Sequence, residues 1–139
     1  MKTLLFVCVH NAGRSQMAEA FANRLAKEQD LEVRAISAGT MGGSELNATA
    51  VLAMLEVGID MTSQHPKVLT QAMVDEADRV ITMGCGVDAS SCPTRFLATE
   101  DWNLDDPAGE PLSRVREIRD QIRDKVRAML GKASEPQGS

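Results

Sequence analysis

The chain of 139 residues lacks an excess of positive charge, a long apolar run and the pattern of a leader sequence. Its net charge of −5 argues against a general binder of nucleic acids or acidic membranes, because those partners require broad positive surfaces. No apolar stretch approaches the roughly 20 residues of a membrane-spanning helix. The apolar run after Lys2 stops at His10, and no signal-peptide cleavage pattern follows it. We therefore expect a cytoplasmic protein whose partners include neither nucleic acid nor membrane.

Cysteine and histidine are also scarce, with three and two residues respectively. Cys85 and Cys92 lie too far apart in sequence for a typical zinc pair, whose members are usually about two to four residues apart. His65 is the only other plausible soft ligand. We therefore expect no bound metal, and thiols kept reduced in the cytoplasm.

Strand-like apolar runs alternate with helical patterns along residues 1–130, which suit one domain. The expected elements are strands at 4–9, 33–36, 79–83 and 96–98, a helix through Met17 and Leu25, and a helix capped by Asn47 and ending near Gly58. A C-terminal helix is expected through Leu112 and Met129, with arginines that mostly form a solvated face. This alternation predicts an α/β fold, a single three-layer α/β/α domain around a four-stranded parallel sheet. We expect residues 131–139 to be a disordered tail.

The most informative segment joins the first strand to the first helix and reads Cys8-Val9-His10-Asn11-Ala12-Gly13-Arg14-Ser15. A short glycine-containing loop at a helix N-terminus can turn several backbone N–H groups toward one centre, where they bind a tetrahedral oxyanion. Arg14 adds a planar charged group suited to two oxygens of that anion. The same positive field lowers the pKa expected for the Cys8 thiol from its usual value near ~8.5, which makes Cys8 a candidate nucleophile.

The neighbours of Cys8 have expected roles of their own. Ser15 is placed to donate its hydroxyl to the Cys8 sulfur, and Asn11 to brace the loop by hydrogen bonding to the backbone. We interpret His10 as an exposed loop residue. The alternative is that Cys8 is an inert cysteine buried in a strand, but the helical pattern after Arg14 and Ser15 favours a reaction centre.

Two further cysteines follow the strand expected at 79–83. If residues 85–92 formed a continuous helix, Cys85 and Cys92 would be separated by roughly 10 Å of rise, whereas a disulfide needs Cα atoms within about 7 Å. A bond between them therefore requires the segment to unwind, and its glycine, serine and proline content makes it a poor helix. The residues leave two interpretations open, a pair of inert buried thiols or a redox pair whose oxidation changes the conformation.

Asp106 lies in a turn-rich segment after the last expected strand. Pro107 biases it toward an extended backbone, which would aim its carboxyl into the anion site and let it protonate a departing oxygen. Ligands of parallel α/β sheets bind beyond the carboxyl ends of the strands, so Cys8, Cys85 and Asp106 are expected to meet there. The residues alone do not separate this role from that of an ordinary turn aspartate.

Together, the Cys8-x5-Arg14-Ser15 loop, Asp106-Pro107 and the Cys85 and Cys92 pair resemble the arsenate reductases of the low-molecular-weight tyrosine phosphatase fold, in particular the thioredoxin-coupled branch with three cysteines. The resemblance extends through nearly the whole chain and includes Ser15-Gln16-Met17-Ala18-Glu19, Ser37-Ala38-Gly39 and Asp105-Asp106-Pro107-Ala108-Gly109. The anion loop is shared with phosphatases, whereas the cysteine pair is specific to the reductases.

The resemblance implies a mechanism. Cys8 attacks arsenate, or a phosphate-like oxyanion, held by the loop and Arg14, while Asp106 protonates the leaving oxygen. Cys85 then attacks Cys8 and expels arsenite, and Cys92 attacks Cys85 to leave a disulfide that thioredoxin reduces. No organic cofactor is implied, because the electrons come from the partner.

Some members of that family bind potassium beside the loop through an Asn, a Glu, a Ser and a downstream Asp. Asn11, Glu19 and Ser37 match the first three, but the downstream region reads Gln64-His65-Pro66-Lys67. The fourth ligand is thus missing. We hypothesise that the Lys67 ammonium takes the place of the cation.

Three other functions remain to be weighed. A protein-tyrosine phosphatase of this fold commonly carries tyrosines after its Asp-Pro, but Ala108 and Gly109 follow here and the chain has no tyrosine. A non-catalytic oxyanion sensor would carry a DNA-binding segment or a basic stripe, and neither is present. In a reductase linked to mycothiol or glutaredoxin, single-cysteine relatives use a low-molecular-weight thiol with a glutaredoxin-like partner, and the presence of both Cys85 and Cys92 argues against that route.

Overall fold

The computed structural model describes residues 2–41, 45–83, 100–102, 104–105 and 107–134, with the backbone alone at 100 and 132–134. Cys85, Cys92 and Asp106, and the strand expected at 96–98, lie outside the described residues. All other expected elements can be compared with the structure directly.

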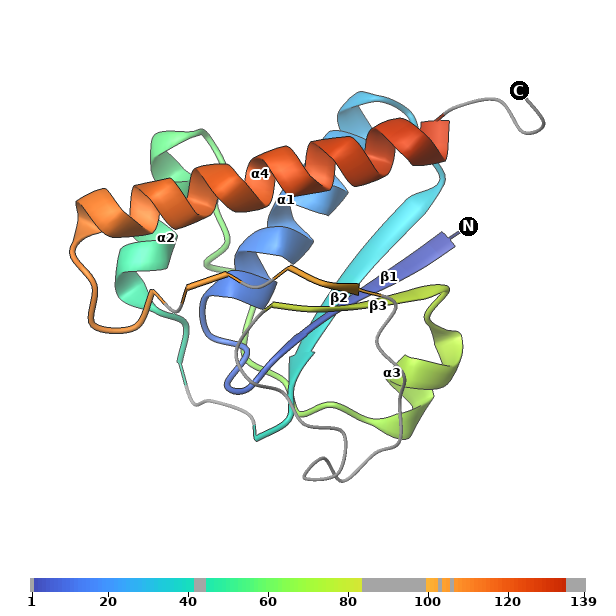
Figure 1. The fold of residues 1–139 in the computed structure, drawn as a ribbon, viewed down its shortest axis with the longest axis horizontal. Coiled ribbons are helices and arrows are strands. Elements are labelled where there is room, and N and C mark those ends of the chain that lie inside the picture. The colour runs from blue at the N-terminus through green and yellow to red at the C-terminus, as the bar shows by residue number, and fades with distance from the viewer. Residues whose placement is uncertain (1, 42–44, 84–99, 103, 106, 135–139) are drawn as a thin grey trace.

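A parallel sheet of four strands, counted over the described residues, runs through the middle of the molecule (Figure 1). In spatial order the strands are β2 (Val33–Gly39), β1 (Lys2–Cys8), β3 (Arg79–Thr82) and β4 (Glu100–Asp101). Every pairing is parallel, and Cys8 lies opposite Gly39 at one end of the sheet. The predicted strands at 4–9, 33–36 and 79–83 are confirmed with small shifts of their ends.

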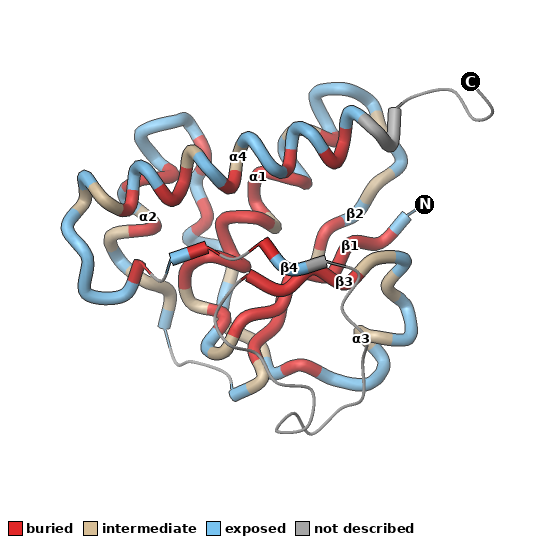
Figure 2. Tube along the Cα trace, viewed as in Figure 1, coloured by how far each residue is buried: buried red, intermediate tan, exposed pale blue. Residues whose placement is uncertain are grey.

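Strand β1 is buried on both faces, as a central strand of a parallel sheet should be (Figure 2). Phe6 and Cys8 point into the larger core, whereas Leu5 and Val7 belong to a smaller core on the other face. Burying a side chain of the size of Leu or Phe contributes roughly 1.5–3 kcal/mol. The apolar run of the sequence thus fixes β1 in the centre and places Cys8 at its carboxyl end.

Helices cover both faces of the sheet, which confirms the three-layer prediction. One face carries α1 (Arg14–Glu28), α2 (Ala48–Glu56) and α4 (Leu112–Ser134), which pack on one another over the larger core. The other carries α3 (Gln71–Glu76), whose Met73 and Val74 pack against the smaller core. Helix α3 was not predicted from the sequence, because six residues are too few to display a helical period.

Local signals place the ends of α2 as expected. The Asn47 side chain accepts a hydrogen bond from the Ala50 N–H at 3.0 Å, so it is the predicted N-cap. Gly58 follows the helix with a φ of 81°, a left-handed conformation that glycine adopts without strain. The cap matters for the site described below, because Asn47 lines its cavity.

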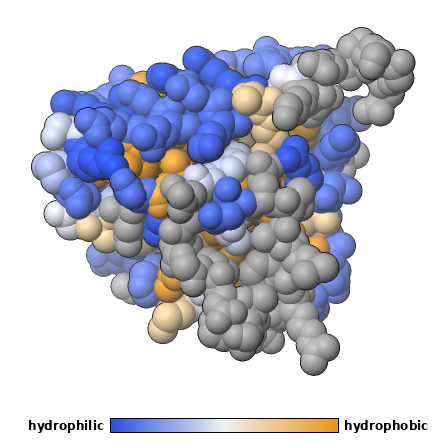
Figure 3. Space-filling view, in the orientation of Figure 1, coloured by the Kyte–Doolittle hydropathy of each residue, from blue (hydrophilic) through white to orange (hydrophobic). Residues whose placement is uncertain are grey.

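Helix α4 presents an apolar stripe to the core and a polar face to solvent (Figure 3). The residues of the stripe lie three or four positions apart and are Val115, Ile118, Ile122, Val126 and Met129. Two expectations need correction. Arg119 is buried and donates to the Ala53 carbonyl and to Glu56 rather than to solvent. The helix also continues to Ser134, so residues 131–134 are helical and not part of a disordered tail.

Candidate active site

The predicted oxyanion loop lies at the carboxyl end of β1, where the chain turns into α1. Gly13 is the N-cap residue, and its carbonyl accepts from the Met17 N–H at 2.9 Å. Three backbone bonds from neighbouring segments hold the loop: Thr40 donates to Cys8, Met41 to Val9 and Asn47 to Ala12. Hydrogen bonds from other segments therefore hold both the beginning of the loop, at Cys8 and Val9, and a position near its end, at Ala12.

Ser15 and Asn11 direct hydrogen-bonding groups at the Cys8 sulfur. Its Sγ lies 2.8 Å from Ser15 Oγ and accepts from the Asn11 N–H at 3.1 Å. Cys8 is buried, with 4% of its surface exposed. A hydroxyl and an amide directed at sulfur near a helix N-terminus stabilise the negatively charged thiolate. The predicted contact between Ser15 and Cys8 is confirmed.

Asn11 orients this donor set through its side chain. Its Oδ1 accepts from Gln16 Nε2 at 2.8 Å and from the Lys67 N–H at 2.9 Å, and its Nδ2 therefore faces Ser15 Oγ, also at 2.8 Å. Because the Ser15 oxygen accepts from Asn11, its own hydrogen is left to point at Cys8. Asn11 has a φ of 55°, a left-handed conformation that asparagine tolerates better than most residues. Asn11 was predicted to brace the loop through backbone hydrogen bonds. Its side chain instead bonds to the side chains of Ser15 and Gln16 and to one backbone N–H outside the loop, that of Lys67.

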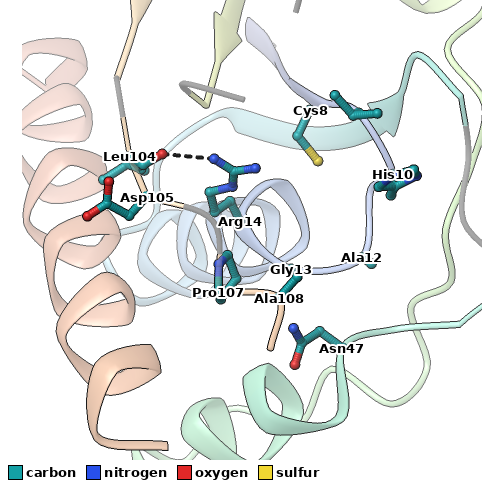
Figure 4. A pocket seen from close by; sticks show the side chains of 11 residues that line it. Cys8, His10, Ala12, Gly13, Arg14, Asn47, Leu104, Asp105, Pro107 and Ala108 are labelled. Carbon is teal, nitrogen blue, oxygen red and sulfur yellow. Dashed lines mark hydrogen bonds between the residues drawn. The ribbon is translucent and has the colours of Figure 1, made fainter. Parts of the chain in front are cut away.

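Arg14 is buried and connects the loop to two distant segments. Its Nη1 donates to the Leu104 carbonyl at 2.8 Å and to the Met83 carbonyl at 3.3 Å (Figure 4). Met83 immediately follows β3, and Leu104 lies beyond β4. One guanidinium thus joins the ends of three strands of the sheet at the place where an anion would bind.

A cavity of about 390 Å³ opens above Cys8 and Arg14. Its remaining lining residues are Val9, His10, Ala12, Gly13, Asn47, Leu104, Asp105, Pro107 and Ala108. His10 is exposed at the rim, as expected. The cavity is thus bordered by the loop at the N-terminus of α1 and by residues of two other segments, at 47 and at 104–108. It can hold a tetrahedral oxyanion against a nucleophilic sulfur.

Two glycines are required by close packing around the loop. A Cβ on Gly13 would lie 2.9 Å from Pro107 Cγ, and a Cβ on Gly39 would lie 2.5 Å from the Val9 carbonyl oxygen. Gly39 was not singled out as a site residue. The signal in the sequence is its position at the end of the strand next to β1, where the chain passes directly behind the loop.

The residues compared with a potassium site lie behind the loop. Ser37 Oγ donates to Glu19 Oε1 at 2.9 Å, and the Lys67 ammonium lies 3.7 Å from the same oxygen. Lys67 Nζ also donates to the His65 carbonyl at 3.2 Å. Among the residues that the structure describes, no group of three or more His, Cys, Asp or Glu side chains could hold a metal ion.

Cys85, Cys92 and Asp106 cannot be placed, because they lie outside the described residues. Met83 and Asp105, which precede two of them in the chain, border Arg14 or the cavity. The roles of these three residues stay predictions. Within the described part of the chain, no helix is long and apolar enough to cross a membrane.

Comparison with known proteins agrees with this geometry. Residues 3–137 match the family described as low molecular weight phosphotyrosine protein phosphatase. A Synechocystis protein named glutaredoxin arsenate reductase is 36% identical over 96% of this chain and 100% of its own length. A solved arsenate reductase in the phosphate binding state is 36% identical with a TM-score of 0.81, covering 96% of this chain and 100% of that one. The thioredoxin-dependent arsenate reductase of Corynebacterium glutamicum is 34% identical with a TM-score of 0.74, covering 95% of this chain and 61% of that one. The chain belongs to the low molecular weight phosphotyrosine protein phosphatase family.

Proposed function

We propose that the protein is an arsenate reductase in which Cys8 attacks arsenate held by the loop and Arg14. The observation that carries this proposal is the environment of the Cys8 sulfur. The sulfur lies 2.8 Å from Ser15 Oγ and 3.1 Å from the Asn11 nitrogen. Cys8 lines the cavity and lies close to the N-terminus of α1. Relatives named arsenate reductase that align over nearly the whole chain support the same reaction.

The first step makes a bond between Cys8 and arsenic. The Cys8 thiolate attacks arsenic, and a hydroxyl oxygen of arsenate leaves as water after taking a proton from Asp106. Arg14 and the loop amides bind the remaining oxygens and stabilise the charge that develops on them. Ser15 and Asn11 present hydrogen-bonding groups that stabilise the thiolate form of the sulfur, which is the form that attacks.

The next steps transfer two electrons to arsenic. The Cys85 thiolate attacks the Cys8 sulfur, the S–As electron pair passes to arsenic, and arsenic(V) leaves as arsenite(III). Cys92 then attacks Cys85 and releases the Cys8 thiolate, which leaves a disulfide between Cys85 and Cys92. A dithiol partner reduces this disulfide and supplies the two electrons of each turnover.

We propose thioredoxin as that partner, with the reaction taking place in the cytoplasm, where a thiol relay stays reduced. The support for thioredoxin is the presence of a second and a third cysteine, together with a relative described as thioredoxin-dependent. Glutaredoxin is the alternative, since another relative carries that name. The proposed chemistry uses no organic cofactor, and we propose that the Lys67 ammonium beside Glu19 serves in place of potassium.

The cavity favours a reductase over a tyrosine phosphatase. Phosphotyrosine needs an aromatic or extended apolar surface for its ring. The described lining contains no Phe, Tyr or Trp side chain, and Pro107 is followed by Ala108 in a chain that has no tyrosine. A phosphatase would also leave Cys85 and Cys92 without a chemical role.

The test is arsenite production with thioredoxin, thioredoxin reductase and NADPH. Wild type should turn over continuously, and Cys8→Ser, Cys85→Ser and Cys92→Ser should not. Cys92→Ser should still complete about one turnover per protein and accumulate a bond between Cys8 and Cys85, visible by mass spectrometry. Sustained turnover by Cys92→Ser would contradict the relay. Phosphotyrosine hydrolysis without arsenate reduction would contradict the proposed function.

A further inference from the structure

A carboxylate lies in the wall of a cavity that is built for an anion. Asp105 lines the cavity together with Cys8 and Arg14, although its negative charge would repel a bound oxyanion. Figure 4 shows its carboxylate turned away from Cys8 and toward α4. Arg14 and the N-terminus of α1 create a positive field that attracts a carboxylate, so another contact must hold Asp105 in the observed direction.

That contact comes from an arginine in the first turns of α4. Arg114 Nη2 donates to Asp105 Oδ2, and Arg114 Nη1 donates to Glu117 Oε2 at 2.6 Å. The Arg114 side chain is 30% exposed and that of Asp105 is 72% exposed. Nothing in the packing therefore restricts Asp105 to this direction, and its pairing with Arg114 decides where its charge lies.

Without that pairing, the carboxylate would have another cation close by. The Leu104 carbonyl accepts from Arg14 Nη1 at 2.8 Å, so the residue next to Asp105 already touches the anion-binding guanidinium. A rotation of the Asp105 side chain would bring its carboxylate toward Arg14, which is the group that an oxyanion must use. Such a carboxylate would compete with the substrate.

The geometry points to Arg114 as a positioning residue for oxyanion binding, which holds the Asp105 carboxylate out of the cavity and away from the Arg14 guanidinium. The inference rests on the proposed function, because it takes the cavity to bind an oxyanion. Arg114 touches neither substrate nor sulfur in this scheme. It acts through Asp105 alone.

The test measures the dissociation constant of inorganic phosphate for the reduced full-length protein by calorimetry. Arg114→Ala should weaken binding about fivefold, the scale of one exposed charge pair. Arg114→Met, which keeps the apolar stem of the side chain, should do the same. The double variant Arg114→Ala/Asp105→Asn should bind as wild type does, because the competing charge is gone.

Two controls separate this role from simpler explanations. Arg123→Ala removes an equal charge from an arginine of α4 that is 31% exposed, pairs with Asp120 and lies roughly 13 Å farther along the helix. It should leave phosphate binding unchanged, whereas a loss caused by net charge would appear in both variants and disappear at high salt. Glu117→Gln should also bind normally, because Arg114 keeps Asp105. A helix-stabilising role of the pair within α4 would instead make Glu117→Gln resemble Arg114→Ala.

Turnover gives an independent readout. Arg114→Ala should raise KM for arsenate with kcat unchanged, and the double variant Arg114→Ala/Asp105→Asn should have the wild-type KM. The inference alone would be overturned if wild type binds phosphate but Arg114→Ala or Arg114→Met binds it equally well. It would also be overturned if adding Asp105→Asn to Arg114→Ala does not restore the wild-type dissociation constant. A wild-type protein that binds no oxyanion would overturn the proposed function as well.

Discussion

The Lys67 ammonium lies 3.7 Å from the Glu19 carboxylate, directly behind the loop that holds the candidate nucleophile. Both side chains are largely buried, at 26% and 12% exposed, so the attraction is screened less than at the surface. The backbone of Lys67 is also part of the loop support, since its N–H donates to Asn11 Oδ1 at 2.9 Å. One residue thus supplies a charge to Glu19 and a hydrogen bond to Asn11.

This arrangement predicts that wild-type arsenate reduction is insensitive to potassium. The positive charge beside Glu19 and Ser37 is covalently attached, so replacing sodium chloride with potassium chloride should change kcat/KM by less than about twofold. Lys67→Asp removes the ammonium and introduces a carboxylate that could bind a cation, so its activity should fall and should respond to potassium. Activity of wild type that rises severalfold with potassium over sodium would refute the substitution.

The hydroxyl of Ser15 should control the reactivity of Cys8. Ser15→Ala removes the group 2.8 Å from the sulfur but leaves the Asn11 N–H in place. A hydrogen bond to a charged group is worth roughly 1.5–3 kcal/mol, so alkylation of Cys8 at neutral pH should slow by about ten- to a hundredfold. The measurement is iodoacetamide labelling of Cys8, followed by peptide mass spectrometry. An unchanged labelling rate would mean that Ser15 does not stabilise the thiolate.

Features that depend on neighbouring residues could be predicted from the sequence, whereas contacts between distant elements could not. The loop from Cys8 to Ser15, strand β1 and the Asn47 cap were predicted because each depends on neighbouring residues. The contacts between Lys67 and Glu19 and between Arg114 and Asp105 join residues on different elements, and no local pattern marks them. Lys67 was identified only because the resemblance drew attention to its position.

The same distinction explains the errors in secondary structure. Helix α3 was missed because its six residues are too few to show an apolar period, although Met73 and Val74 pack against the smaller core. The arginines of α4 were assigned to a solvated face on composition, but Arg119 is held by Glu56 and the Ala53 carbonyl of α2. The charge of an arginine does not by itself show whether a hydrogen-bond acceptor lies on another helix.

A single added methyl group should distinguish two glycines. A Cβ on Gly39 would lie 2.5 Å from the Val9 carbonyl oxygen and 2.9 Å from the Asn11 nitrogen, and neither backbone atom can move without disturbing the loop. Gly39→Ala should lower the free energy of unfolding by about 1–3 kcal/mol and weaken phosphate binding. The measurements are urea denaturation and calorimetry.

Gly131 provides the matched control. It lies in α4, and a Cβ there meets nothing within 4 Å. Gly131→Ala should therefore raise the free energy of unfolding by roughly 0.5–1 kcal/mol, because alanine loses less entropy in a helix. Equal effects of the two substitutions would show that packing against the loop is not what requires Gly39.

The network that joins α2 to α4 should make stability depend on pH in one direction. The pKa of Glu56 lies below its ordinary value of 4.5, chiefly because Arg116 donates to its carboxylate and secondarily because Arg119 does. A carboxyl whose pKa is lower in the folded state binds fewer protons there than in the unfolded chain. Its contribution to stability is therefore complete above pH 4.5 and is lost as the pH falls through the lower folded value.

Glu56→Gln should accordingly be less stable than wild type at neutral pH, and the difference should shrink below pH 4.5 as the wild-type carboxyl becomes protonated. Urea denaturation of both proteins across this range measures the difference. Glu28→Gln is the control, since it removes a pair 3.9 Å long within α1 that joins no two elements. A difference between Glu56→Gln and wild type that stays constant down to strongly acidic pH would show that the carboxylate charge is not what ties α2 to α4, because a neutral hydrogen bond or a packing effect would not titrate.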